Sequence, residues 1–135
     1  MSERVTGGCH CGNLRVSLEL SRAAIAYSPR ACDCEFCRKH GAAWVSDPDG
    51  ALRIQITDDR EVVRYRQGSG SAEILICRVC GVVVAVTYLA RHAAVNARVL
   101  DAAFAADKVA SPKLLATDEK VGRWQALWFA DVTFG

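Results

Sequence analysis

All seven cysteines of this 135-residue sequence fall in three short clusters, and cysteine sulfur is a usual ligand of structural zinc. The clusters are Cys9-His10-Cys11-Gly12, Cys32-Asp33-Cys34-Glu35-Phe36-Cys37 and Cys77-Arg78-Val79-Cys80-Gly81. Residues two apart in an extended segment point to the same side, so Cys9 and Cys11 can bind one ion together. Gly81 permits the tight turn that follows a Cys-x-x-Cys pair. Three clusters that hold every cysteine therefore predict metal binding, with zinc as the ion.

Core packing, disulfide formation and redox chemistry account for the spacing of these cysteines less well. A buried cysteine can act as a small hydrophobic residue of the core. Disulfides fit poorly with an odd number of cysteines, with the strained ring of a Cys-x-Cys bridge and with a reducing cell interior. A thioredoxin-like redox pair at Cys77 and Cys80 should begin a helix, whereas residues 82–86 have the pattern of a strand.

The simplest division of the seven thiols is four plus three. The two paired clusters would form a closed tetrahedral zinc site, the four-thiol cluster of Cys9, Cys11, Cys77 and Cys80. Closed sites are structural and can contribute on the order of 10 kcal/mol to folding. The remaining three-thiol cluster consists of Cys32, Cys34 and Cys37. Three protein ligands with an open fourth position are typical of a catalytic zinc. Alternatively, His40, His92 or an acidic residue closes a second structural site, or the trio binds no metal.

The rest of the chain supplies mainly strands that can position these clusters. Residues 14–20 alternate apolar and polar side chains with period two, which is typical of a strand with one buried face. Further strands are expected at 52–56, 62–66, 72–77, 81–89, 94–100 and 125–134. Helices are limited to an alanine-rich segment, 101–109, and a second from 117 to about 125 that Thr117 or Asp118 would cap. The expected fold class is mainly β, with one or two short helices.

Composition and charge exclude several kinds of partner. The net charge of +2 is spread along the chain, and no basic block of the kind that binds nucleic acid or a membrane surface is present. With 51% hydrophobic and 24% charged residues, the composition is that of a globular protein, and a length of 135 residues predicts one domain. Together with the cysteine clusters, this predicts a single zinc-binding domain over residues 1–135. The sequence contains no apolar run typical of a signal peptide or a membrane span, so a cytoplasmic protein is expected.

The order of these motifs resembles the glutathione-dependent formaldehyde-activating enzyme and centromere protein V family. The matching motifs are Gly8-Cys9-His10-Cys11-Gly12, Cys32-x-Cys34-x-x-Cys37-Arg38-Lys39, Gly41-Ala42 and Cys77-x-x-Cys80-Gly81. The resemblance implies a β-tent, in which two antiparallel sheets are drawn together at a zinc site. It also implies a structural zinc at the four-thiol cluster and a second, labile catalytic zinc at the three-thiol cluster. Asp33 stands where relatives often carry histidine.

An open zinc position at the three-thiol cluster would favour the thiolate form of an incoming thiol, because a cation stabilises thiolate over thiol. That sulfur could add to the carbonyl carbon of a small aldehyde, and the reverse step would cleave the carbon–sulfur bond. The resemblance implies glutathione as the thiol co-substrate and formaldehyde as the aldehyde. Arg38 and Lys39 are candidates for binding the glutathione carboxylates, His40 for carrying a proton and Trp44 for a pocket wall. The ordinary alternatives are solvated cations, a surface histidine and a core tryptophan.

The sequence therefore predicts a zinc-dependent carbon–sulfur lyase or synthase that acts on a glutathione adduct of formaldehyde or another small aldehyde. The alternative is a non-catalytic, zinc-stabilised protein-binding module of the same fold, with a structural or vestigial three-thiol cluster. A zinc-ribbon nucleic-acid binder is disfavoured by the balanced charge. The expected partners are a small-molecule thiol and an aldehyde, without nucleic acid or membrane, and a homodimer stays open.

Overall fold

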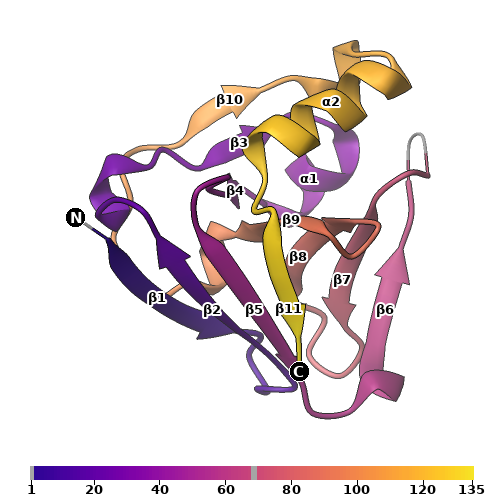
Figure 1. Ribbon diagram of the computed structural model, residues 1–135. Helices are drawn as coiled ribbons and strands as arrows, with labels where there is room; N and C mark the ends of the chain where they lie inside the picture. Colours follow the sequence, from indigo (N-terminus) through magenta and orange to yellow (C-terminus); the bar gives the residue numbers. More distant parts are fainter. Residues whose placement is uncertain (1, 68–69) are drawn as a thin grey trace.

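The computed structural model describes residues 2–67 and 70–135, whose strands form two β-sheets (Figure 1). Within these residues the smaller sheet has four strands in the order β1-β2-β5-β11. Its strands are β1 (Glu3–Gly8), β2 (Leu14–Leu20), β5 (Ala51–Ile56) and β11 (Asp131–Phe134). β1, β2 and β5 pair antiparallel, whereas β11 joins β5 in parallel.

The larger sheet contains seven described strands in the order β10-β3-β4-β9-β8-β7-β6. They are β3 (Arg30–Cys32), β4 (Trp44–Val45), β6 (Val62–Tyr65), β7 (Glu73–Cys77), β8 (Val83–Tyr88), β9 (His92–Asn96) and β10 (Lys108–Ala110). β6 to β9 form an antiparallel series, and β10 pairs with β3 in parallel. Short 3-10 turns occur at Ala24–Ala26, Asp59–Glu61, Ala97–Val99 and Pro112–Leu114.

The main core is formed by side chains from both sheets. β2 follows the alternation predicted from its sequence, and its buried residues are Leu14, Val16, Leu18 and Leu20. They belong to one cluster with Leu75 of β7 and Val84 of β8. Removing these apolar side chains from water is the main favourable term in bringing the two sheets together.

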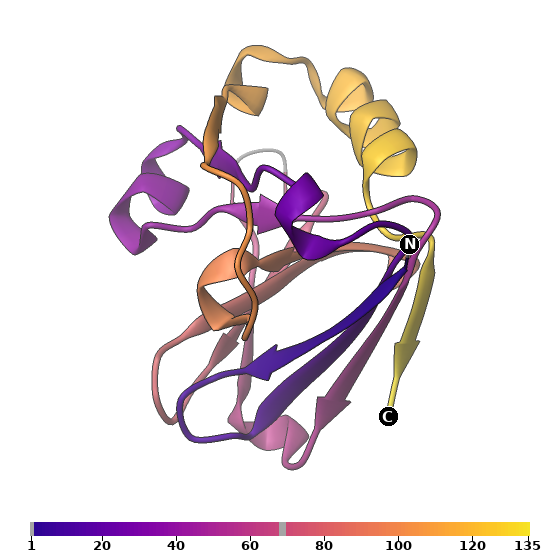
Figure 2. The same ribbon diagram turned by 90° about the vertical axis from the view of Figure 1, so that its left-hand side faces the viewer.

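The described residues contain two α-helices, α1 (Glu35–His40) and α2 (Thr117–Leu127), which lie at the upper end of the molecule in Figure 1. In Figure 2 the orange segment that contains β10 arches over this end and leads into α2. The turns from β1 to β2 and from β7 to β8 lie together at the lower end (Figure 1). The prediction of a mainly β fold with two sheets and one or two short helices is confirmed, although only one of the two helices lies where it was predicted. Neither described helix is long and apolar enough to span a bilayer.

The predicted alanine-rich helix at 101–109 is wrong. This segment is not helical, and its last part forms the edge strand β10. Its backbone N–H groups bond to other segments: Asp101 N–H to Thr6, Ala105 N–H to Tyr27 and Lys108 N–H to Pro29. These long-range hydrogen bonds replace the local ones of a helix, so tertiary pairing overrides the helix propensity of alanine.

The helix predicted from 117 to about 125 is confirmed as α2, but its predicted cap is wrong. Ala116 precedes the helix, and its backbone N–H donates to Oε1 of Glu119 at 2.8 Å. The side chain of Glu119, which lies within the helix, therefore accepts the hydrogen bond that caps the first turn. The strand predicted at 125–134 is shorter than expected, because residues 125–127 belong to α2. Sequence reasoning missed α1 altogether.

The strand predicted at 94–100 ends early, at Asn96 of β9. The Asn96 side chain accepts a hydrogen bond from Arg98 N–H at 3.2 Å and begins the 3-10 turn Ala97–Val99. The same side chain donates to the carbonyl of Val83 at 2.9 Å. A polar side chain that bonds the backbone locally thus stops the strand.

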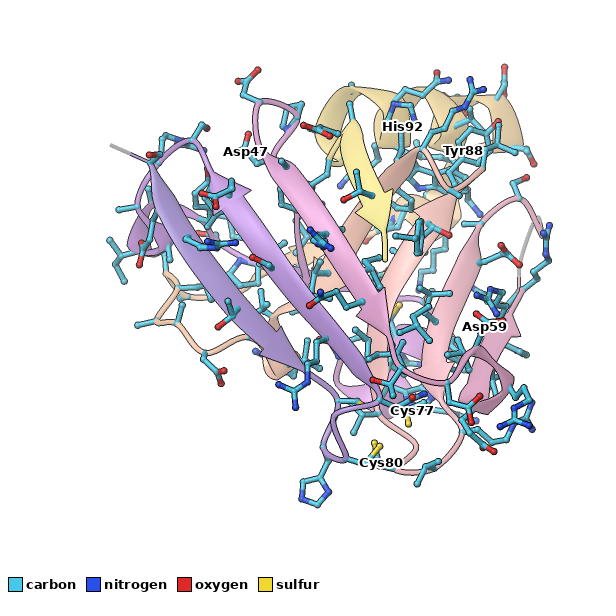
Figure 3. The ribbon with its side chains drawn as sticks, turned by 60° about the horizontal axis from the view of Figure 1, so that its bottom comes forward. Asp47, Asp59, Cys77, Cys80, Tyr88 and His92 are labelled. Carbon is cyan, nitrogen blue, oxygen red and sulfur yellow. The ribbon has the colours of Figure 1, made fainter. Side chains whose placement is uncertain are left out.

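The buried carboxylate of Asp47 connects three segments above β5 (Figure 3). Its hydrogen-bond donors are Ser21 N–H at 2.8 Å, Ser21 Oγ at 2.6 Å, Tyr27 OH at 2.6 Å and Asp49 N–H at 2.9 Å. Burial raises the pKa of Asp47, but these hydrogen bonds outweigh it and lower the pKa to about 2.

Asp47→Asn is expected to make the free energy of unfolding less sensitive to acidic pH. The folded pKa of about 2 lies below the ordinary value of 3.8. The ionised carboxylate therefore stabilises the fold above about pH 5, and this stability is lost as the pH falls through about 2. Between about pH 5 and about pH 2, the free energy of unfolding measured with urea should fall by about 2 kcal/mol more in the natural protein than in the variant. Asp49→Asn, in the same turn, is the control; equal pH dependence of all three proteins would contradict this assignment.

Candidate metal centres and active-site pocket

The four-thiol cluster joins the turn after β1 to the turn between β7 and β8. The Sγ atoms of its members all lie within 4.8 Å of one another. Cys11 Sγ lies 3.7 Å from Cys9 Sγ and 3.5 Å from Cys77 Sγ. Figure 3 shows Cys77 and Cys80 side by side at the bottom of the molecule. The cluster therefore connects the smaller sheet to the larger one.

Local backbone geometry prepares the Cys77–Cys80 turn. Gly81 N–H donates to the Cys77 carbonyl at 2.9 Å, and Cys77 N–H donates to the Val82 carbonyl at 3.0 Å. Gly81 has a φ of +77°, the left-handed conformation that glycine adopts without strain. The role predicted for Gly81 in a tight turn is therefore confirmed.

The four-thiol cluster has the dimensions of a zinc site. A tetrahedron with zinc–sulfur bonds of about 2.3 Å has sulfur–sulfur edges of about 3.8 Å. The separations of 3.7 and 3.5 Å from Cys11 Sγ are close to this value. All seven cysteines are free thiols, because no pair is near the sulfur–sulfur bond length of about 2 Å. The donor set fits a closed, structural zinc.

The thiols of the four-thiol cluster differ in acidity. Burial raises the pKa of Cys80, but hydrogen bonds with the backbone of Cys11 and Val82 outweigh it and lower the pKa to about 6. At Cys11 the backbone of Asn13 lowers the pKa, but the hydrogen bond to Cys77 and partial burial raise it to about 12. One thiolate is therefore favoured near neutral pH before any cation is bound.

The three-thiol cluster lies where β3 meets α1. Cys32 ends β3, Cys34 is the residue that caps α1, and Cys37 lies in the first turn of that helix. The Cys34 sulfur accepts a hydrogen bond from Cys37 N–H at 3.4 Å, so it occupies the place of a capping side chain. All three Sγ atoms lie within 4.8 Å of one another, close enough to bind one ion.

No fourth protein ligand joins the three-thiol cluster among the described residues. His40 is exposed and packs against Phe36, with ring centres 4.5 Å apart. Asp33 accepts a hydrogen bond from Ser111 Oγ at 2.6 Å and lies 3.8 Å from Lys113 Nζ, so its carboxylate binds the segment after β10. His92 lies on β9, outside the group. The alternative in which one of these side chains closes the site finds no support among the described residues, because none of them groups with the three thiols.

The thiols of the three-thiol cluster differ in how readily they lose a proton. The hydrogen bond from Cys37 lowers the pKa of Cys32 to about 6, against the opposing effect of burial. The same hydrogen bond and burial raise the pKa of Cys37, which the Trp44 side chain lowers in part. Cys32 is therefore the thiol that ionises first, and it prepares the cluster to receive a cation.

The three-thiol cluster opens into a pocket of about 360 Å³ between β3, α2 and the segment around Pro112. The pocket is lined by all three thiols of the cluster and by every tryptophan of the sequence, Trp44, Trp124 and Trp128. Trp124 stacks on Trp128 with ring centres 5.1 Å apart. The cationic lining residues are Arg30, Lys113, Lys120 and Arg123.

The four-thiol cluster borders a different hollow, which is open to solvent along β1 and β2. This hollow has a volume of about 670 Å³ and is lined by Cys9 and Cys11 but by neither Cys77 nor Cys80. An ion held by all four thiols would have no open corner there. Only the three-thiol cluster combines an incomplete ligand set with an adjoining pocket among the described residues.

Some of the side chains selected from the sequence lie away from this pocket. Arg38 and Lys39 are exposed on α1, outside the lining, and Lys39 Nζ pairs with Glu35 at 3.1 Å. Their role in binding glutathione stays a prediction. Trp44 is both a buried core residue and part of the pocket wall. His10 is exposed and does not line this pocket.

Sequence reasoning missed the cations and two of the tryptophans of the pocket. Arg30 precedes Cys32 by two residues on β3, so both side chains point to the same side of the strand. Its Nη2 donates to Ser46 Oγ at 2.6 Å, and Ser46 Oγ donates to the carbonyl of Leu127 at 2.7 Å. Burial and the charge of Arg123 lower the pKa of Arg30 to about 10, which leaves it charged at neutral pH. In the sequence, the Arg30-x-Cys32 spacing was the signal that could have placed Arg30 beside the three-thiol cluster.

Comparison with known proteins agrees with this architecture. The family model of the glutathione-dependent formaldehyde-activating enzyme matches residues 4–117. The crystal structure of a Rhodobacter sphaeroides protein aligns with a TM-score of 0.56 and 23% identity, over 96% of this chain and 99% of that chain, and so shows the same fold. No curated protein matches the sequence. The chain belongs to the glutathione-dependent formaldehyde-activating enzyme family.

Proposed function

We propose that the protein is a zinc-dependent carbon–sulfur lyase or synthase that forms and cleaves the glutathione adduct of formaldehyde or another small aldehyde. The observation that carries this proposal is the incomplete three-thiol cluster at the wall of a pocket. The family supports glutathione and formaldehyde as the reacting molecules. We place the activity in the cytoplasm, where glutathione keeps thiols such as these seven reduced.

The two clusters would have different roles towards zinc. The four-thiol cluster would hold a structural ion at the junction of the two sheets. The three-thiol cluster would hold a second ion through Cys32, Cys34 and Cys37 and leave a position towards the pocket. When bound there, zinc would supply the positive charge that favours the thiolate form of a substrate thiol.

The reaction needs no oxidant or reductant. The sulfur of the thiol forms a bond to the carbonyl carbon, the thiol gives up its proton, and the carbonyl oxygen gains one. Trp44 and Trp128 are buried and line the pocket, so they limit the access of water to the reacting carbon. In the reverse direction the carbon–sulfur bond breaks and releases thiol and aldehyde.

Exchange NMR with ¹³C-labelled formaldehyde and glutathione tests this activity directly. The rate at which the S-hydroxymethyl adduct forms should rise above the spontaneous rate in proportion to protein concentration. The same protein should accelerate the breakdown of the preformed adduct. If neither rate changes while the protein stays folded and zinc-loaded, the non-catalytic module is the better description.

A further inference from the structure

We propose that Arg30 and Arg123 form a carboxylate-binding subsite, here called the arginine subsite, which selects thiols that carry a carboxylate. This inference rests on the proposed function, because it concerns how the same pocket recognises its thiol substrate. It assigns this recognition to β3 and α2 rather than to the exposed cations of α1. The ligand class is a thiol carboxylate, of which glutathione is one example.

The charge of the pocket is the first observation. Its lining contains four cationic side chains, the two arginines with Lys113 and Lys120, and among the described residues no carboxylate, so the only acidic groups are the three thiols. Among the described residues Lys113 lies 3.8 Å from Asp33, whereas neither arginine nor Lys120 takes part in an ion pair. Like charges gathered in a partly enclosed pocket repel one another, and an anionic ligand relieves that repulsion.

The position of Arg30 is the second observation. Because it lies two residues before Cys32 on one strand, its backbone is about 7 Å from that of the metal-ligand cysteine, on the same side. Its bond to Ser46 Oγ uses one of five N–H donors and fixes the guanidinium in the pocket wall. A held guanidinium with free donors suits bidentate binding of a carboxylate.

The inward face of α2 is the third observation. Residues spaced three and four apart lie on one face of a helix, and the half-buried residues of α2 are Val121 and, at this spacing, Lys120, Arg123, Trp124 and Leu127. In a helix that only covers a core, such positions are normally apolar. Two cations on the packed face, beside a tryptophan that stacks on Trp128, mark this face as part of a binding site.

The chain offers matched variants for a test. Arg123→Gln removes the charge but keeps a long polar side chain, and Arg123→Lys keeps the charge without the planar fork. Arg38→Gln and Lys39→Gln remove exposed cations that directly follow Cys37 in sequence but lie outside the pocket. Circular dichroism checks that each variant is folded. Because all three tryptophans line the pocket, their fluorescence reports on binding.

Dissociation constants should be measured for glutathione, its diethyl ester, 3-mercaptopropionate and cysteamine. The natural protein should bind glutathione at least tenfold more tightly than its diethyl ester, and 3-mercaptopropionate at least tenfold more tightly than cysteamine. The reason is that a hydrogen bond to a charged group changes binding affinity by about a factor of ten. Arg123→Gln should lose about tenfold in affinity for glutathione and raise KM with little change in kcat. Arg123→Lys should recover part of the preference, and the two α1 variants should behave like the natural protein.

Two results would overturn the arginine subsite while leaving the proposed function intact. One is equal affinity of the active natural protein for glutathione and its diethyl ester. The other is an unchanged preference in Arg123→Gln, or the same loss in Arg38→Gln, which would indicate a general effect of charge. If the natural protein binds no thiol and catalyses no reaction, the proposed function itself fails and the subsite with it.

Discussion

Cys77→Ser is expected to remove most of the stability of the fold. Cys77 is fully buried in the main core and belongs to the four-thiol cluster that joins the two sheets. Formation of a closed zinc site can contribute on the order of 10 kcal/mol, whereas a whole domain is stable by about 5–15 kcal/mol. Thermal unfolding followed by circular dichroism should show a lost or strongly lowered transition, and metal analysis should show loss of the tightly held zinc.

Val79→Ser provides the control for this variant. Val79 lies in the same turn, is 63% exposed and is not a member of the cluster, so its replacement by serine should leave the unfolding temperature and the zinc content unchanged. Cys77→Ser with the zinc content and unfolding temperature of the natural protein would show that the four-thiol cluster does not stabilise the fold.

Cys34→Ser is expected to abolish activity and leave the protein folded. The serine hydroxyl can still cap α1, since serine is among the best capping residues, but it is a much poorer zinc ligand than a thiolate. The zinc content should fall by one ion per chain, and the unfolding temperature should change by only a few degrees. Adduct formation, followed by NMR, should return to the spontaneous rate.

Glu35→Ser changes the residue that follows Cys34 and is the control for this variant. It distinguishes the loss of a zinc ligand from a change in the structure of α1. Glu35 is exposed, and its ion pair with Lys39 is a surface pair of the kind that contributes little to stability. This variant should keep both zinc ions and full activity. If Cys34→Ser and Cys77→Ser lose stability and zinc alike, the division into four and three thiols is wrong.

The parts of this protein that depend on local pattern could be predicted from its sequence. The alternation of residues 14–20 identified β2, because a strand between core and solvent requires period two. The spacing of the cysteines indicated which thiols gather within each short cluster, because short-spaced ligands need only a turn to meet at one point. The meeting of Cys9 and Cys11 with Cys77 and Cys80 depends instead on how the two sheets pack. Gly81 was identified for the same reason, as the turn itself demands its conformation.

The parts that depend on distant pairing could not be predicted. Residues 101–109 have helical composition, yet they form no helix, and their backbone bonds instead to Thr6, Tyr27 and Pro29. Arg38 and Lys39 directly follow the last cysteine of their cluster in sequence, and both are exposed on α1, a position that the sequence alone did not indicate. The cations that line the pocket come from β3, α2 and the segment between them, which only the folded chain brings together.

Zinc content with and without glutathione tests the central claim most directly. The account predicts two zinc ions per chain, one of which a mild chelator removes without unfolding the protein. X-ray absorption at the zinc edge should show that glutathione adds a sulfur neighbour to this labile ion and leaves the tightly held ion unchanged. A single zinc, or a second zinc already bound by four protein atoms and unaffected by glutathione, would contradict the account.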